Sequence, residues 1–137
     1  MTEAAIILRL TVADPVPGVH YSLQDQKSMP VEPRTADEGP LVFDIPVCLH
    51  PDGRLTGPFV RREGPERRFV YIAIGTAAGD CASAWSRRAK IDIHDIPAAL
   101  LDHARAGGVL AVDLPGRDRN GCPACATVRP LDGWRPL

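Results

Sequence analysis

The chain has 137 residues, and its 16 basic side chains nearly balance its 17 acidic ones, so no overall field attracts nucleic acid or an acidic membrane surface. Its 45% hydrophobic and 24% charged residues exclude a disordered chain and are enough to form a hydrophobic core. Its 14 prolines and 12 glycines favour many turns over a coiled coil, a helical bundle or a solenoid. We therefore expect one domain over residues 1–137.

The first half of the chain alternates apolar and polar residues with the period of two that is typical of a half-buried strand. This alternation predicts strands over residues 4–12 and 41–49, with a shorter one over residues 19–24. Pro46 marks residues 41–49 as an edge strand, because proline cannot donate a hydrogen bond to a neighbouring strand. Residues 25–40 contain three prolines and are expected to form a mobile loop or a lid.

Apolar and alternating segments continue in the second half. Residues 69–74 are apolar on both faces, which predicts a central strand that is covered on both sides. The loop before them, residues 61–68, has four arginines and two glutamates. Such a loop can hold phosphate groups, but a hairpin tip laced with ion pairs is the favoured interpretation. Further strands are expected over residues 87–93, 109–114 and 124–129.

One helix is predicted, at about residues 96–106. Asp95 can cap it, Pro97 fits its first turn, and Gly107-Gly108 ends it. The helical spacing of Ile96, Leu100 and Ala104 predicts its buried face. Seven to eight strands with this one helix indicate a mostly β fold, either a small β-barrel or a β-sandwich.

Several short motifs together resemble one known family. They are Pro17-Gly18-Val19, Gly57-Pro58-Phe59-Val60, Arg68-Phe69-Val70-Tyr71, Trp85-Ser86-Arg87-Arg88-Ala89-Lys90 and Cys125-Ala126-Thr127-Val128. Over about residues 4–134 the chain is similar to a bacterial family of small proteins, the domain of unknown function numbered 5990. The resemblance implies a single compact bacterial domain, and no activity, cofactor or catalytic residue follows from it. Cys122 departs from the family pattern, so a shared Cys-x-x-Cys function is not implied.

Cys122-Pro123-Ala124-Cys125 has the spacing of redox and zinc sites. A redox pair needs a thiolate stabilised at a helix N-terminus, whereas the residues that follow Cys125 favour a strand. A zinc site needs two further ligands, and no second close pair is formed by the available residues Cys48, Cys81, His50, His94 and His103. The spacing of Cys48 and His50 is too tight for a zinc knuckle. We predict ordinary cysteines, with no stoichiometric zinc, no catalytic disulfide and no cofactor; a zinc site and a redox pair are the less favoured alternatives.

The segment Trp85–Lys90 is the candidate for ligand binding. Arg88 and Lys90 are two residues apart, so they project from one face of a strand. Arginine binds a carboxylate or phosphate through two parallel hydrogen bonds, and a tryptophan stacks on an aromatic ring. If this face lines a barrel interior, the cations require an anion there; the alternative is a solvated face with Lys90 paired to Asp92. The predicted ligand-binding residues are Tyr71, Trp85, Arg88 and Lys90.

No catalytic residue is predicted, because the four histidines lie far apart and no P-loop, nucleophile elbow or His-Glu-x-x-His motif is present. Two function classes are expected instead. The first is a β-barrel-like protein that binds a small anionic or aromatic molecule, with catalysis of a reaction left open. The second is a non-enzymatic module that binds a protein or a second copy of itself, as a homodimer, through the edge at residues 41–49. A zinc-stabilised module at Cys122 and Cys125 is a third, less favoured interpretation.

Neither a nucleic-acid partner nor a membrane partner is expected. No apolar stretch reaches the roughly 18 residues that cross a bilayer, and no basic segment precedes the first apolar run at residues 4–8. The expected location is therefore the cytoplasm.

Overall fold

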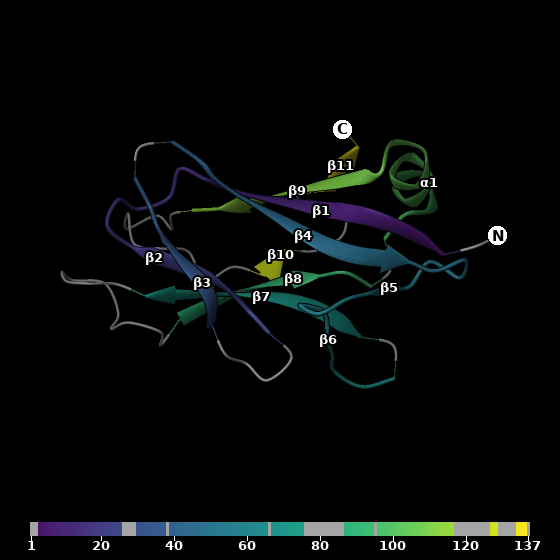
Figure 1. The fold of residues 1–137 in the computed structure, drawn as a ribbon, viewed down its shortest axis with the longest axis horizontal. Coiled ribbons are helices and arrows are strands. Elements are labelled where there is room, and N and C mark those ends of the chain that lie inside the picture. Colours follow the sequence, from purple (N-terminus) through teal and green to yellow (C-terminus); the bar gives the residue numbers. More distant parts are fainter. Residues whose placement is uncertain are drawn as a thin grey trace.

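The computed structural model describes residues 3–25, 30–37, 39–65, 67–75, 87–94, 96–116, 127–128 and 134–136. In these residues the strands form two sheets that face each other (Figure 1). The first, here called the β1 sheet, has the order β11 (Trp134–Pro136), β9 (Val109–Pro115), β1 (Ala4–Ala13), β4 (Leu41–Leu49), β5 (Leu55–Thr56). The second, here called the β7 sheet, has the order β10 (Thr127–Val128), β8 (Arg87–Asp92), β7 (Arg68–Gly75), β2 (His20–Gln24), β3 (Pro30–Thr35), and β6 (Arg61–Arg62) also pairs with β7.

The hydrophobic core lies between the two sheets and follows the alternation of the sequence. In the β1 sheet, β1 pairs antiparallel with β4 and parallel with β9, so that Leu8 lies beside both Ile45 and Leu110. These three side chains are fully buried. In the β7 sheet, Val70 and Ile91 are partners across β7 and β8 and belong to the same core. The interior of the molecule is thus filled by aliphatic side chains from both sheets.

The prediction of a mostly β fold with one helix is confirmed, and of its two alternatives the sandwich describes the structure. In the described part of the chain the strands form two separate sheets rather than one closed barrel. Among the described residues seven strands have five or more residues; six of them were predicted and β3 was not. Of the strand predicted over residues 124–129, only Thr127–Val128 are described, as β10. β5, β6 and β11 have only two or three residues, which is too short to produce a periodic pattern in the sequence.

The prediction of a loop over residues 25–40 is wrong for Pro30–Thr35, which form β3 and pair antiparallel with β2. β3 has β2 as its single neighbour at the end of the sheet. An edge strand tolerates proline, because one side of its backbone needs no partner. The proposed role of residues 25–40 as a mobile lid stays a prediction. The edge prediction for β4 agrees with the structure over most of its length, since β5 pairs only with Cys48 and Leu49.

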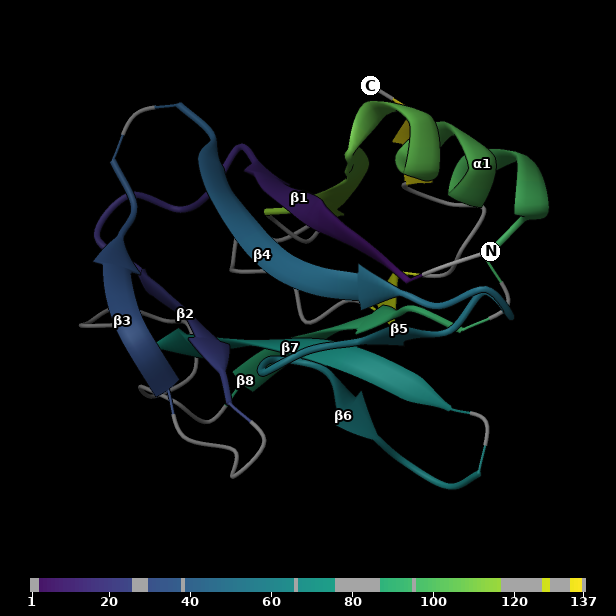
Figure 2. The same cartoon turned by 45° about the vertical axis from the view of Figure 1, so that its right-hand side comes forward.

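The helix α1 spans Ala98–Gly107 and lies at one end of the sandwich beside β1 and β9 (Figure 2). Pro97 is its N-cap residue, and the predicted cap Asp95 lies outside the described residues. Gly108 adopts the left-handed conformation and donates its N–H to the Ala104 carbonyl, so the predicted C-terminal stop is confirmed. The buried face includes Leu101 where the spacing had predicted Leu100. No helix in the described ranges has the length and hydropathy needed to span a membrane.

Candidate functional site

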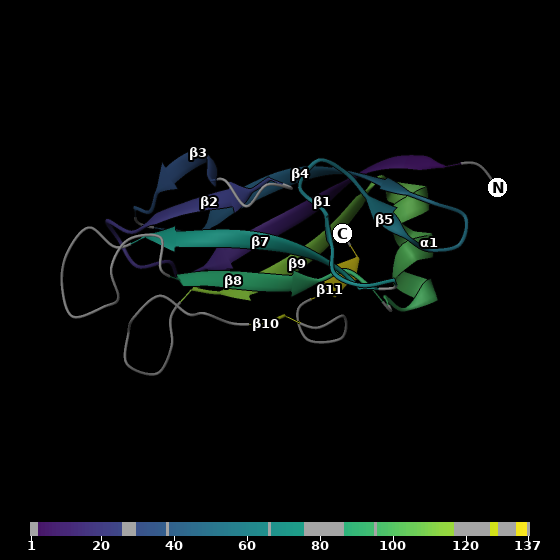
Figure 3. The ribbon, with the colours of Figure 1, turned by 90° about the horizontal axis from the view of Figure 1, so that it is seen from below.

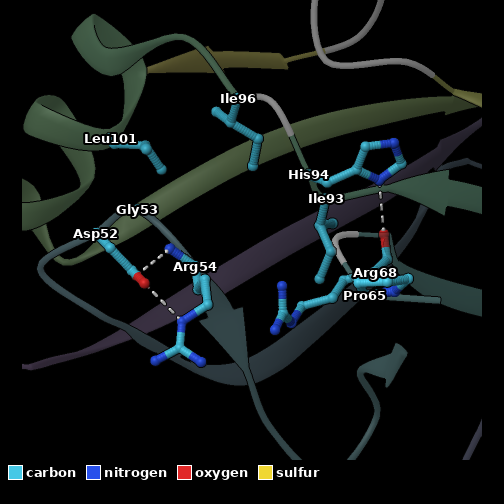
Figure 4. A pocket seen from close by; sticks show the side chains of 9 residues that line it. All are labelled: Asp52, Gly53, Arg54, Pro65, Arg68, Ile93, His94, Ile96 and Leu101. Carbon is cyan, nitrogen blue, oxygen red and sulfur yellow. Dashed lines mark hydrogen bonds and ion pairs between the residues drawn. The ribbon is translucent and has the colours of Figure 1, made fainter. Parts of the chain in front are cut away.

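A pocket of about 470 Å³ opens at the end of the sandwich where the turn after β4, the start of β7, the end of β8 and the approach to α1 meet (Figure 4). Its walls combine two arginines, one histidine and one aspartate with aliphatic side chains. The lining residues are Asp52, Gly53, Arg54, Pro65, Arg68, Ile93, His94, Ile96 and Leu101.

The turn after β4 brings Arg54 to the pocket. It is closed by hydrogen bonds from Gly53 N–H to the His50 carbonyl and from His50 N–H to the Arg54 carbonyl, both 2.9 Å. Gly53 has a φ of +92°, and a Cβ there would lie 3.3 Å from Cδ1 of Leu101. Glycine satisfies both conditions, since it adopts positive φ without strain and leaves room for the helix.

Asp52 fixes the orientation of Arg54. Its Oδ2 lies 2.8 Å from Arg54 Nε, and its Oδ1 accepts the Arg54 backbone N–H at 3.0 Å. The backbone hydrogen bond, followed by the positive charge of Arg54, lowers the pKa of Asp52 although desolvation opposes it. The ionised carboxylate holds the guanidinium at the pocket, with about half of the Arg54 side chain exposed to solvent.

Arg68 is the unusual member of the pocket, because it is a buried cation with 9% of its surface exposed. Its backbone is fixed on three sides: Arg68 pairs with Arg62 of β6, and its carbonyl accepts hydrogen bonds from Ile93 N–H at 3.0 Å and His94 Nδ1 at 3.3 Å. Figure 4 shows its guanidinium on the same side of the pocket as that of Arg54. Within the described residues no carboxylate forms an ion pair with Arg68.

The other side of the pocket is apolar. Ile93, Ile96 and Leu101 are all buried, and in Figure 4 Ile96 and Leu101 lie across the pocket from the two guanidinium groups. A cationic side facing an aliphatic side suits a molecule that has an anionic group at one end and an apolar body at the other.

The predicted ligand residues Tyr71, Arg88 and Lys90 come together on a different surface. Tyr71 and Lys90 are partners across β7 and β8, and Arg88 lies two residues from Lys90 on the same face. This face is the outside of the β7 sheet, seen from below in Figure 3, because Ala89 and Ile91 occupy the core side. The interpretation of these cations as the lining of a barrel interior is therefore wrong. Trp85 lies outside the described residues.

The cations of this surface contact groups of the protein itself. Arg88 Cζ lies 4.3 Å, Arg61 Cζ 5.0 Å and Lys90 Nζ 5.7 Å from the centroid of the Tyr71 ring, so the ring interacts with three cations. Lys90 Nζ pairs with Glu63 at 3.2 Å. The alternative of a solvated face had predicted a pair between Lys90 and Asp92 instead. Neither the pocket described above nor one lined by Ala99, Asp102, His103 and Ala106 includes Tyr71, Arg88 or Lys90, and their role in ligand binding stays a prediction. We call Arg61, Glu63, Tyr71, Arg88 and Lys90 the Tyr71 cluster.

Comparison with known proteins gives one match. The model of a family of unknown function, DUF5990, matches residues 6–136. The chain belongs to this family. The resemblance found in the sequence motifs is thereby confirmed over nearly the whole chain. No curated protein and no solved structure matches the chain. Functional inference therefore depends on the side chains of the pocket and of the Tyr71 cluster.

Tyr71→Phe removes a hydrogen bond to Glu63 and should lower the free energy of unfolding by about 1.5 kcal/mol near pH 7. This value is the lower end of the range for a hydrogen bond to a charged group, and we choose it because Glu63 is more than a third exposed. The Tyr71 hydroxyl donates to Glu63 Oε1 at 2.5 Å. This bond, helped by Lys90, lowers the pKa of Glu63. A lowered carboxyl pKa stabilises the fold above the ordinary pKa, and this stabilisation is lost as pH falls through the lowered value.

The difference between wild type and Tyr71→Phe should accordingly shrink between about pH 7 and about pH 3, as measured by urea unfolding. The matched control is the same substitution in a Glu63→Gln background, where the difference should not vary with pH. A difference that stays constant in the wild-type background as well would show that the Glu63 charge contributes nothing to this bond.

Sequence interpretation missed Arg54 and weighed Arg68 only as part of the loop over residues 61–68. One signal for Arg68 was available in the sequence: it directly precedes a segment that is apolar on both faces. Such a position is buried, and because long cations are rarely buried without a partner, it indicates a candidate site residue. His94 had been considered as a residue available for a zinc site and not as part of a pocket. Its contact with the Arg68 carbonyl depends on the pairing of β7 with β8, which sequence spacing does not show.

The remaining candidates take no part in the pocket. His20 Nδ1 lies 2.8 Å from Thr35 Oγ1, a contact between β2 and β3. His103 is exposed on α1. Cys122 and Cys125 lie outside the described residues, so the predictions made for them stay predictions.

Proposed function

We propose that this protein binds a small molecule that carries a carboxylate or phosphate group on an apolar body, in the cytoplasm of a bacterium. One observation supports the proposal above the others: Arg68, a residue with 9% of its surface exposed, borders a pocket and has no carboxylate partner among the described residues. The charge is compensated when an anion occupies the pocket.

The energetics of burial favour this assignment. Removing a cation from water is costly, and proteins usually offset this cost with an ion pair or with several hydrogen bonds. Asp52 compensates Arg54, but no such partner serves Arg68 in the described part of the chain. An anionic ligand provides the partner, and guanidinium groups match the planar geometry of a carboxylate or the oxygens of a phosphate.

The apolar half of the pocket restricts the ligand class further. A bare inorganic anion leaves Ile93, Ile96 and Leu101 without a contact, whereas an alkyl or aryl group covers them and gains about 25 cal/mol for each Å² of apolar surface removed from water. We therefore expect an aryl or alkyl carboxylate or phosphate ester to bind more tightly than inorganic phosphate.

The test is isothermal titration calorimetry with benzoate, phenyl phosphate and inorganic phosphate. Arg68→Met should weaken binding of the tightest probe about 10- to 150-fold, the equivalent of about 1.5–3 kcal/mol for a hydrogen bond to a charged group. The matched control is Arg88→Ala, which removes a cation from the Tyr71 cluster and should leave the dissociation constant unchanged.

The control also tests the second location for the same function. One observation favours the Tyr71 cluster: Nη1 of Arg61 is buried and has no hydrogen-bond partner among the residues that the structure describes. If Arg88→Ala weakens binding and Arg68→Met does not, the ligand binds at the Tyr71 cluster and the pocket assignment is wrong. If none of the probes binds to the wild-type protein, the proposed ligand class is wrong.

The alternative of a docking module that uses the edge of β4 has less support. Val42 is the one exposed large hydrophobic residue in the described ranges. Its carbonyl already accepts a hydrogen bond from Arg34 Nη1, and Pro46 has no N–H to offer a further strand. An edge blocked at two positions is a poor template for strand addition.

A further inference from the structure

Three metal-ligating side chains meet where β1 begins and β4 ends, next to the turn that carries Gly53 and Arg54, but none of the three lines the pocket. Ala4 pairs with Leu49 and Ala5 with Cys48, so Glu3 comes next to His50 in the antiparallel register. Cys48 and His50 are two residues apart and project to the same side of the chain. One oxygen of Glu3, the sulfur of Cys48 and a ring nitrogen of His50 all lie within 4.8 Å of one another. Figure 1 shows the start of β1 beside the end of β4 and near β5.

The spacing of these atoms is close to that of a tetrahedral metal site. His50 Nδ1 lies 3.0 Å from Glu3 Oε1, and Cys48 Sγ lies 3.6 Å from Glu3 Oε2. Zinc bonds of about 2.0 Å to nitrogen or oxygen and about 2.3 Å to sulfur separate tetrahedral ligands by roughly 3.3–3.6 Å. The two contacts use different oxygens of Glu3, and one ligand atom from each side chain lies within 4.8 Å of the others, so the side chains must draw closer together to hold one ion.

The surroundings of His50 favour the ring orientation that such a site requires. Without a metal, Nδ1–H donates to the Glu3 carboxylate at 3.0 Å. A bound ion would replace that proton on Nδ1, and Nε2, which lies 2.8 Å from Thr56 Oγ1 on β5, would then donate its N–H to the hydroxyl. The His50 carbonyl accepts a hydrogen bond from Arg105 Nη2 of α1 at 2.9 Å, which fixes the backbone. The His50 side chain is only 15% exposed, whereas Glu3 is 63% exposed and free to adjust.

We propose that Glu3, Cys48 and His50 bind one divalent ion of the zinc class and leave its fourth position to solvent. A thiolate and an imidazole select borderline ions such as Zn²⁺ or Co²⁺ over Mg²⁺ and Ca²⁺, which prefer oxygen ligands. On binding, a metal–sulfur bond replaces the S–H bond of Cys48, and the proton goes to solvent. The site is independent of the proposed anion pocket, so either one can fail without the other.

The sequence had excluded a knuckle because Cys48 and His50 are too close together. A zinc knuckle needs two pairs of ligands that are each close together in the sequence, and only that kind of site was excluded. The third ligand here comes from the neighbouring strand, and Glu3 is 45 residues from Cys48, so the β1–β4 register forms a site that spacing alone cannot reveal.

The experiment is a titration of the full, metal-free chain with Co²⁺, followed by absorbance. A thiolate-to-cobalt charge-transfer band with the strong visible bands of tetrahedral Co²⁺, saturating at one ion per chain, is the expected result. The bands should persist in the double variant Cys122→Ser/Cys125→Ser, which removes the competing Cys-x-x-Cys pair. The charge-transfer band should disappear in Cys48→Ser.

Two further variants test the geometry without disturbing the core. Thr56→Val removes the hydroxyl that orients His50, and it should weaken Co²⁺ binding about 10- to 100-fold, as loss of a supporting hydrogen bond does in other metal sites. Glu3→Gln changes an exposed side chain, so the fold should stay intact in circular dichroism while Co²⁺ affinity falls at least tenfold. The proposal is overturned if Co²⁺ does not bind, if Glu3→Gln binds as tightly as wild type, or if the charge-transfer band depends on Cys122 and Cys125 instead of Cys48.

Discussion

Gly116→Ala should lower the free energy of unfolding by about 3 kcal/mol, the upper part of the range for overpacking a closed site. A Cβ at this position would lie 2.5 Å from the Asp14 carbonyl oxygen and would also overlap the carbonyl oxygen of Ala13. Both are backbone atoms. They cannot turn away as a side chain can, because Ala13 pairs with Pro115 at the end of the β1–β9 ladder. Asp14 itself has a φ of +50°, so the backbone there has little freedom to relax.

Gly107→Ala is the matched control for this substitution. Gly107 is the last residue of α1, and a Cβ there meets nothing within 4 Å. Alanine is favoured over glycine in a helix by up to about 1 kcal/mol, so this variant should be as stable as wild type or more stable. Urea unfolding of the three proteins measures both effects. Equal stabilities for the two variants would mean that the β1–β9 ladder opens at little cost and that the close approach of Gly116 is not a constraint.

The elements that could be predicted are those in which one short segment contains the whole signal. The alternation of Ile6, Leu8 and Leu10 shows the buried face of β1 without knowledge of its neighbours. The apolar run of β7 indicates a strand covered on both faces, and all eight of its residues are buried. Gly108 ends α1 through a conformation that glycine adopts without strain.

The elements that could not be predicted depend on pairing between distant segments. β3 is a strand because β2 offers it an edge, although its two prolines favour a loop. β9 lies parallel to β1, about a hundred positions earlier in the chain, and no local pattern indicates that partnership. The choice between a sandwich and a barrel depends on the same long-range pairings, so the sequence left both open.

For the candidate sites too, the sequence predicted what one segment contains and not what depends on contacts between distant segments. The two-residue spacing of Arg88 and Lys90 correctly placed both on one face of β8, but the sequence does not show whether that face points to the core or outward. Arg54 and Arg68 reach one pocket because a turn and a strand start meet at the end of the sandwich. Neither segment alone contains a motif, so this convergence required the structure.

Arg68→Met should raise the free energy of unfolding of the unliganded protein by about 1–2 kcal/mol, the lower part of the range for replacing buried charge with an apolar side chain. Methionine is flexible and close to arginine in length, so it can follow the same path through the pocket wall. Arg68, in contrast, is 9% exposed and has no carboxylate partner among the described residues. A side chain whose role is purely structural would give the opposite sign.

Addition of a ligand should reverse the order of stability of wild type and Arg68→Met. At a probe concentration of about 100 times its dissociation constant, wild type gains about 2.7 kcal/mol of stability from binding. Arg68→Met, with its weakened site, gains far less, so wild type becomes the more stable protein under these conditions. Denaturant unfolding with and without the tightest probe measures the crossing. If Arg68→Met is less stable than wild type both with and without the probe, Arg68 stabilises the fold through contacts of its own and the pocket does not require an anion. If the order of stability reverses when the probe is added, the buried charge of Arg68 serves binding, because a cation that destabilises the free protein is then stabilising only in the complex.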